Sequence, residues 1–487
     1  MAFALVAPRR VLRALCVSCR YNEHALWPRW EREGRLLKSE IRNPKSEIRR
    51  AIVVSFDRLH VGYLGCYGND WIETPNLDRL ATEAVIFDAH FSENLDSAAV
   101  NHAWWTGRCQ FPLDAQAQRD CRQFADDLRS AQIHTWLLVE SDGREETMVA
   151  PSFDDVLTIR GTDGLEASES ETPFARVVQH ACDWLDESAG RQVPELLWIK
   201  SRGVPSPWLP PRDFADLYLD EFGLAAEEDV ESGEDSEASE SAEEDAQSQL
   251  DKGPPQVPPT RGVPQPDESL DWRYAAAMYA GYVTLIDRWF GKLAARLARS
   301  PEWADALLIV CAGSGQPLGE HARVEEDEPL LRAECVQVPL WVRLSGSDQR
   351  GTRRKSMVQT IDVAPTLTEW FELAHSGPDA CESDNRLLAG KSLLPLIRTE
   401  RPAIRDAALM GIGRREWGIR TPDFFYVEPG DGERATDRPA FLFEKPQDRW
   451  DQCDVLSQYS EIADELRDRL RQVVQERRLG SLKRDGS

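Results

Sequence analysis

Three places in the chain put a side chain capable of chemistry at the end of an apolar run. Asp57 follows the run 51–56, Lys200 ends the run 196–200, and residues 312–314 close a third run that begins at 306. In an open α/β sheet, ligands collect at the carboxyl ends of the strands, so these positions are candidates for one shared site. A carboxylate there would attract a cation, and an ammonium group would contact an anion.

Signatures of several other reaction classes are missing from the sequence. It contains no GxSxG nucleophile elbow, no GxxxxGK[ST] phosphate loop and no HExxH zinc motif. Cys16 and Cys19 form the only CxxC, without a second pair to complete a zinc site. The ten cysteines are spread singly along 487 residues, which does not indicate a disulfide framework.

The elements that must position the three sites follow from apolar patterning. Short runs rich in Val, Ile and Leu predict buried strands at 51–56, 134–139, 196–200, 306–312 and 338–344. Helical spacing predicts helices at 76–84, 172–188 and 272–298. Strands that alternate with helices favour an α/β fold, with a large, mostly parallel sheet flanked by helices.

Composition divides the rest of the chain. Residues 1–48 are expected to be a disordered leader, and 49–400 the α/β domain. Within that domain, the acidic and Pro-rich segment 225–267 is expected to be a disordered insert. Residues 401–487 predict a small α+β subdomain of short antiparallel strands, with an amphipathic helix at 461–477.

The net charge and the hydropathy of the chain limit the kinds of partner that it could bind. A formal net charge of −26 argues against binding to nucleic acid. No run is long enough to span a bilayer, and no convincing signal peptide is seen, so a cytoplasmic location is the default expectation. Oligomeric state and substrate are left open.

Several motifs occur in an order that resembles the sulfatase family of the alkaline-phosphatase superfamily. They include SFDRLHVGYLGCYG, ETPNLDRLA, TGR, GSGQPLGEH, VPLWVR and IDVAPTLTEW, spread over about residues 52–456. The resemblance implies two aspartates after the first strand and a Cys or Ser that matures to formylglycine, followed by an arginine. It also implies a later Asp beside His or Asn. Together these residues would bind one divalent cation, usually calcium, and Lys and His side chains would contact the sulfate.

The chain departs from that pattern at four positions. Asp57 matches the first aspartate, but Arg58 stands at the second. Ser97 and Ala99 fit the nucleophile motif, but Asn101 replaces its arginine. Gly313 and Ser314 fall where the later metal-binding pair should be, and Lys200 is a candidate contact to sulfate.

These losses favour a sulfatase-like protein with impaired catalysis. Asp57 alone offers one carboxylate, whereas a hard divalent cation takes six or more oxygens. We therefore expect no cofactor, or calcium if the chain is active. The first alternative is an active sulfate- or phosphate-ester hydrolase that uses Ser97, with Asp57 as metal ligand and Lys200 on the anion. The second is a non-catalytic protein that binds or scaffolds a sulfated small molecule, a glycan or a partner enzyme.

Each candidate residue also has a structural interpretation. Asp57 could cap the turn after its strand, Ser97 could act with Asp96 as a helix N-cap, and Lys200 could be a structural cation. His60, like His102, has no partner that the sequence reveals and is expected to be structural. The tryptophans, Trp104 and Trp105 among them, are expected to pack in the core rather than to stack on a sugar.

Overall fold

The computed structural model describes residues 48–109, 111, 124–141, 153–165, 167–205, 208–219, 269–321, 323–324, 330–373, 389–433, 435 and 437–485. The leader expected before residue 48 and the insert expected at 225–267 lie outside the described residues.

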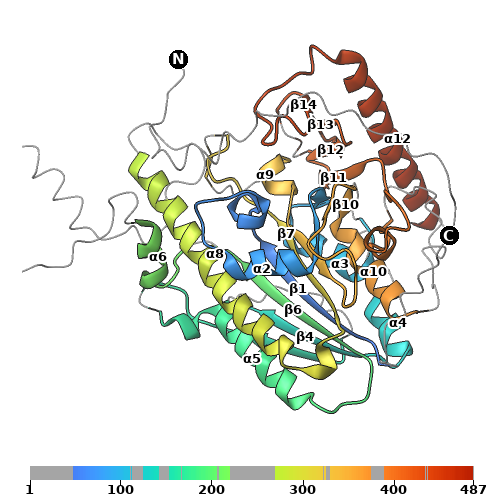
Figure 1. Cartoon of the computed structure of the whole chain (residues 1–487). Coiled ribbons are helices and arrows are strands. Elements are labelled where there is room, and N and C mark those ends of the chain that lie inside the picture. Colours follow the sequence, from blue (N-terminus) through green and yellow to red (C-terminus); the bar gives the residue numbers. More distant parts are fainter. Residues whose placement is uncertain are drawn as a thin grey trace, which may run out of the picture.

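A large sheet forms the centre of the molecule (Figure 1). Its strand order within the described chain is β5-β4-β6-β1-β7-β8-β2-β9. The first five of these are parallel, whereas β8 runs antiparallel to both β7 and β2. The predicted, largely parallel sheet is confirmed, and the run at 338–344 supplies its antiparallel strand. The bounds are β1 (Arg50–Arg58), β2 (Val85–Phe87), β4 (His134–Glu140), β5 (Asp155–Ile159), β6 (Glu195–Gly203), β7 (Leu307–Ser314), β8 (Leu340–Arg343) and β9 (Arg353–Arg354).

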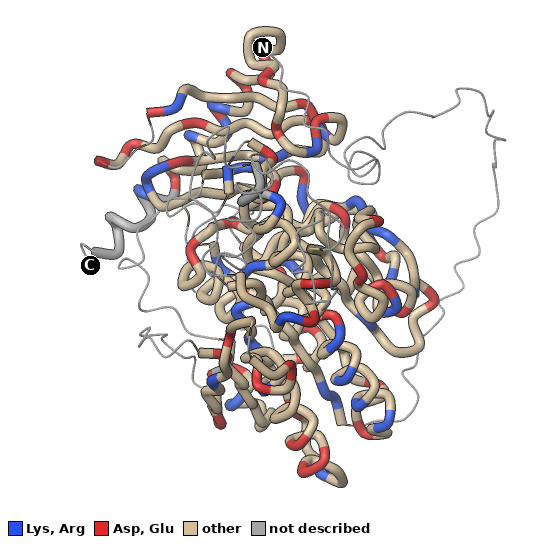
Figure 2. Tube along the Cα trace, turned by 90° about the vertical axis from the view of Figure 1, so that its left-hand side faces the viewer, with Lys and Arg blue, Asp and Glu red and all other residues tan. Residues whose placement is uncertain are grey.

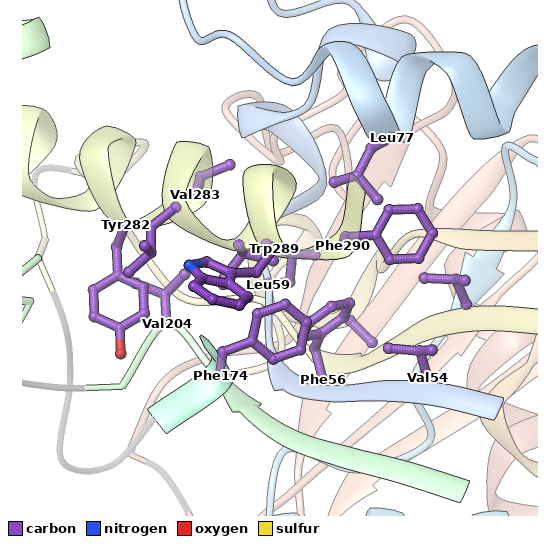
Figure 3. Close-up of a cluster of buried hydrophobic side chains, with 14 of the residues drawn as sticks. Val54, Phe56, Leu59, Leu77, Phe174, Val204, Tyr282, Val283, Trp289 and Phe290 are labelled. Carbon is purple, nitrogen blue, oxygen red and sulfur yellow. The ribbon is translucent and has the colours of Figure 1, made fainter. Parts of the chain in front are cut away.

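Helices cover both faces of this sheet, because its central strands are apolar on both sides. In β1, Val54 and Phe56 belong to one buried cluster, whereas Ala51 and Val53 belong to another. Successive side chains of a strand point to opposite faces, so each cluster marks one face. The first face, shown in Figure 3, is covered by α2 (Pro75–Glu83), α5 (Pro173–Glu187), α6 (Arg212–Leu219) and α8 (Ser269–Ala298). The second is covered by α3 (Ser97–Thr106), α4 (Phe124–Ser130), α10 (Val363–Trp370) and α11 (Leu394–Ile397).

The helix α8 illustrates how the apolar spacing in the sequence corresponds to burial in the structure. Its predicted apolar face is buried throughout, and it lies along the first face of the sheet beside α5 (Figure 1). It also supplies Asp287, which accepts hydrogen bonds from the backbone N–H groups of Asn76 and Leu77 at the start of α2. The two elements are therefore joined by a buried carboxylate as well as by apolar contact.

A second, antiparallel sheet follows in the C-terminal part of the chain. It consists of β11 (Ala408–Ile412), β12 (Glu416–Arg420), β13 (Phe424–Pro429) and β14 (Phe441–Glu444), in that order. The helix α12 (Ser460–Asp485) packs on it through Leu466, Leu470 and Val473. The predicted antiparallel strands and amphipathic helix are confirmed, and the helix is longer than predicted.

The remaining elements are short. They are the strands β3 (His90–Phe91) and β10 (Val358–Gln359), the helix α9 (Ala333–Val336), and the 3₁₀ helices η1 (Val61–Tyr63), η2 (Gly65–Tyr67), η4 (Glu169–Glu171), η6 (Pro301–Trp303) and η7 (Thr360–Asp362).

Charged residues of both signs are interspersed along the described chain (Figure 2). None of the described helices combines the length and the apolar character that crossing a membrane requires.

Candidate functional site

Three of the candidate positions lie side by side on one face of the sheet. Phe56 pairs with Ala312 and Arg58 with Ser314, so Asp57 and Gly313 are neighbours across β1 and β7. Alternation places Asp57 on the face of Ala51 and Val53, which is the face that α3 covers. By the same alternation along β6, Lys200 shares the face of Leu196 and Trp198, which belong to that cluster as well. The sheet thus brings together Asp57, Gly313 and Lys200.

Lys200 forms an ion pair with Asp57 at this strand end. Its Nζ donates to Asp57 Oδ2 over 2.7 Å, and the two side chains are only 4% and 14% exposed. A charge-assisted bond of that length, largely shielded from water, holds both groups in one arrangement. The Asp57 carboxylate is therefore neutralised by an ammonium group of the protein itself, and the interpretation of Lys200 as a structural cation gains support.

Apolar side chains of α3 occupy the space beside Gly313. A Cβ atom at residue 313 would lie 2.8 Å from Val100 Cγ1 and 3.1 Å from the Trp104 ring, and both of these side chains are buried. A contact under 3.0 Å requires the Val100 side chain to shift, and the second neighbour, Trp104, is fully buried. An aspartate at 313 would therefore require this packing to rearrange. Burial of Trp104 and Trp105 also confirms their predicted packing role.

Arg58 does not share the face of Asp57. It alternates with Asp57 at the end of β1, and therefore points to the face that α8 covers. Burial raises the pKa of the Tyr279 phenol on α8, and the nearby positive charge of Arg58 partly offsets that rise. The positive charge beside Asp57 thus comes from Lys200, and not from Arg58 at the position of the family's second aspartate.

Ser97 is the first residue of α3 and is half-buried. Asp96, and not Ser97, is the N-cap, because Asp96 Oδ1 accepts from the backbone N–H of Ala99 over 2.9 Å. Ser97 precedes Val100 by one helical turn and so lies on the helix side that faces the strand ends. Asn101, at the position of the family's arginine, is buried.

The oxygen donors around Asp57 do not fit a divalent cation. Across the described ranges, no group of three or more His, Cys, Asp or Glu side chains is arranged to hold a metal ion. The Ser314 hydroxyl, a further oxygen at this edge, donates to the Asp57 backbone carbonyl over 3.1 Å. Asp57 is thus a carboxylate occupied by Lys200, beside a glycine that contributes no ligand.

The structure also assigns partners to the histidines. His60 is buried, with its Nε2 3.0 Å from Glu320 Oε1, and its Nδ1 accepts from the N–H of Gly62. Although burial alone would raise it, the contact with His60 lowers the pKa of Glu320. Sequence reasoning missed this link between DRLH and LGEH, which places His60 in the scaffold as expected.

Comparisons with known proteins agree with this architecture. A family profile described as Sulfatase matches residues 49–373. The multifunctional alkaline phosphatase superfamily protein PehA of Trinickia caryophylli is 31% identical over 158 residues, which cover 32% of this chain and 27% of that protein. An N-acetylglucosamine-6-O-sulfatase of Bacteroides thetaiotaomicron is 27% identical over 168 residues, covering 32% and 28%. The matched segments thus span little more than a quarter of these curated relatives.

Solved structures resemble the chain over most of its length. The phosphonate monoester hydrolase of Agrobacterium radiobacter superposes with a TM-score of 0.64 at 18% identity, covering 88% of this chain and 96% of that one. A protein solved in complex with its substrate D-glucosamine-2-N,6-O-disulfate superposes with a TM-score of 0.65 at 18% identity, covering 90% and 99%. At such identities the likeness establishes the fold.

Proposed function

This chain belongs to the sulfatase family, and we propose that it is a member that no longer hydrolyses esters by the family's metal-dependent route. The observation that carries the proposal is the buried pair between Lys200 Nζ and Asp57 Oδ2, next to a glycine where the family has a carboxylate and where a Cβ atom would come within 2.8 Å of Val100. The protein's own ammonium group takes the position beside Asp57 where the family pattern calls for a cation.

Electrostatic repulsion determines whether a divalent ion can lie beside Asp57 together with the Lys200 ammonium. A charge of +2 placed about 4 Å from a charge of +1 is repelled by about 8 kcal/mol at an effective dielectric constant of about 20, so a divalent ion beside the Lys200 ammonium would be strongly disfavoured. One neutralised carboxylate cannot offset that cost, since calcium normally gains from several anionic oxygens. Lys200 would have to leave its buried position before the ion entered.

Ser97, the candidate nucleophile, likewise lacks the groups that would activate it. A serine hydroxyl reacts slowly unless a base or a metal ion activates it. Asn101 cannot supply the forked, permanently charged contact that an arginine would make to an anion or to a hydrated aldehyde. We therefore assign Ser97 no catalytic role in the proposed state.

A binding role is compatible with the retained fold. The ligand class that family membership favours is a sulfate ester of a small molecule or a glycan. The competing function is an active hydrolase, which the half-buried position of Ser97, one turn from Val100, favours. In that case calcium would be required, and Lys200 would contact the ester.

An assay of ester hydrolysis distinguishes the proposed function from that of an active hydrolase. The purified chain is assayed with an aryl sulfate and an aryl phosphate, with and without calcium, beside Ser97→Ala and the surface control Ser170→Ala. We expect no turnover above background from any of the three, and an unmodified Ser97 by mass spectrometry. Calcium-dependent hydrolysis that Ser97→Ala abolishes and Ser170→Ala retains would refute the proposal.

A further inference from the structure

A small polar pocket lies beside the segment that follows β7. It is formed by the segment after β7, by α9 with the residues just before it, and by the connection between β13 and β14. Its volume is about 60 Å³. The polar lining includes His321, Arg323, Arg332, Glu334 and Arg438, whereas Asp57, Ser97 and Lys200 do not line it. It therefore gathers three guanidinium groups between the segment that follows β7 and the connection between β13 and β14.

Two of these arginines are held by an aromatic platform. The Phe441 and Phe443 rings of β14 stack with centroids 5.9 Å apart and an interplanar angle of 11°. Arg332 lies 5.4 Å from the Phe441 centroid and 5.5 Å from that of Phe443, and Arg438 lies 4.8 Å from Phe441. Cation–π contacts restrict the guanidinium planes, so fewer rotamers are lost when a ligand binds.

Two carboxylates of the described chain lie close to these guanidinium groups and to His321. Arg438 pairs with Glu416 over 3.4 Å. Glu334 is 1% exposed, lies 3.5 Å from His321 Nε2, and has a buried Oε2 without a hydrogen-bond partner in the described structure. Burial raises the pKa of Glu334, and the contact with His321 opposes that rise.

The pocket has the right size for a small oxyanion. A cavity needs about 10–15 Å³ of this volume for each water-sized group, so about 60 Å³ holds roughly four to six. Sulfate and phosphate have five heavy atoms each, and arginine forks match their oxygens in pairs.

We propose that this pocket binds a tetrahedral oxyanion, sulfate or phosphate, either free or as the terminal group of an ester, through Arg332 and Arg438. The proposal does not depend on whether the Asp57 site is active. The structure thus assigns anion recognition to a second place in the fold, beside the aromatic platform of β14.

Equilibrium dialysis with radiolabelled sulfate and phosphate tests this assignment. The variants are Arg332→Gln and Arg438→Gln, with Arg478→Gln as the matched control, because Arg478 stacks on Trp417 in the same subdomain but does not line the pocket. We expect one saturable site, at least tenfold weaker in either pocket variant and unchanged in the control. Competition by phenyl phosphate or phenyl sulfate identifies an ester ligand, and its absence identifies the free anion.

The Asp57→Asn/Lys200→Met double variant distinguishes the two sites. Binding that survives in it supports the pocket, whereas binding that disappears there and persists in both arginine variants overturns the proposal. Absence of saturable binding by the wild type overturns it as well. Arg332→Lys and Arg438→Lys keep the charge and the packing, so they should retain part of the affinity even if a glutamine variant fails to fold.

Discussion

Lys200 and Asp57 depend on each other because both charges are largely removed from water. In Lys200→Met the Asp57 carboxylate loses its partner, and breaking such a pair costs about 3 kcal/mol or more. Adding Asp57→Asn removes the stranded charge and should recover much of that loss. Urea denaturation of the two single variants and the double variant gives the coupling free energy.

The sign of the coupling free energy decides whether the pair between Lys200 and Asp57 contributes to stability. We expect the double variant to be less destabilised than the sum of the two single variants by at least about 1 kcal/mol. Additive costs would mean that the pair contributes nothing in solution, and the assignment of Lys200 as the resident cation would fail.

Glu93 gives the fold a dependence on pH. It is buried, accepts a hydrogen bond from Thr360, and burial raises its pKa to about 8, with Asp362 adding to the rise and Arg405 opposing it. Since the folded pKa exceeds the ordinary value of 4.5, the folded protein binds more protons between about pH 4.5 and 8. This contribution to stability is therefore present at low pH and is lost as the pH rises through that window.

Glu93→Gln removes this contribution while keeping a hydrogen-bonding side chain. The slope of the unfolding free energy against pH should become less negative between pH 5 and 8, by up to about 1.4 kcal/mol per pH unit. Glu140, whose pKa burial raises to about 7, provides the matched comparison, since Glu140→Gln should act over a lower part of the range. Identical slopes in wild type and Glu93→Gln would contradict the assignment.

Among the elements, α2 depends on α8 for its N-terminal cap. Thr74 occupies the N-cap position but makes no side-chain capping bond. Asp287 instead accepts from the backbone N–H groups of Asn76 and Leu77 over 3.2 and 2.7 Å. A buried carboxylate that satisfies helix N–H groups is stabilised by their charge and by the helix dipole.

Asp287→Ala should therefore destabilise the protein by about 2–4 kcal/mol, because the N–H groups it leaves at the start of α2 are partly buried. Asp287→Asn keeps one oxygen and should cost less. Chemical denaturation gives the free energies, and hydrogen exchange should show faster exchange in α2 than in α12. A cost below about 0.5 kcal/mol for the alanine variant would show that α2 is capped in another way.

The elements themselves could be predicted far better than their partners. Apolar runs gave β1, β6 and β7, because a strand buried on both faces carries its signal locally. The pairing of Asp57 with Lys200 joins residues 143 positions apart, and it depends on a register that neither segment encodes alone. The packing of Val100 against Gly313 could not be predicted from the sequence either, because it depends on how closely α3 approaches β7.

At the scale of the whole molecule, the family's architecture persists, and we propose that the chemistry at its strand ends has changed. The parallel sheet, the helices on both faces and the antiparallel C-terminal sheet are all present. Core packing tolerates changes at the strand ends as long as volume and pattern are kept, so a fold can outlast its reaction. The pocket around Arg332 and Arg438 is lined by residues of the segment between β7 and β8 and by Arg438 of the connection between β13 and β14.

Calcium binding to the purified full-length chain tests the central claim most directly. Isothermal titration calorimetry, with inductively coupled plasma mass spectrometry of the dialysed protein, measures both affinity and stoichiometry. We predict less than 0.1 calcium per chain after dialysis, on the order of background, and no saturable heat at micromolar calcium, because the Lys200 ammonium already neutralises Asp57. One tightly held calcium per chain, lost in Asp57→Asn, would contradict the account.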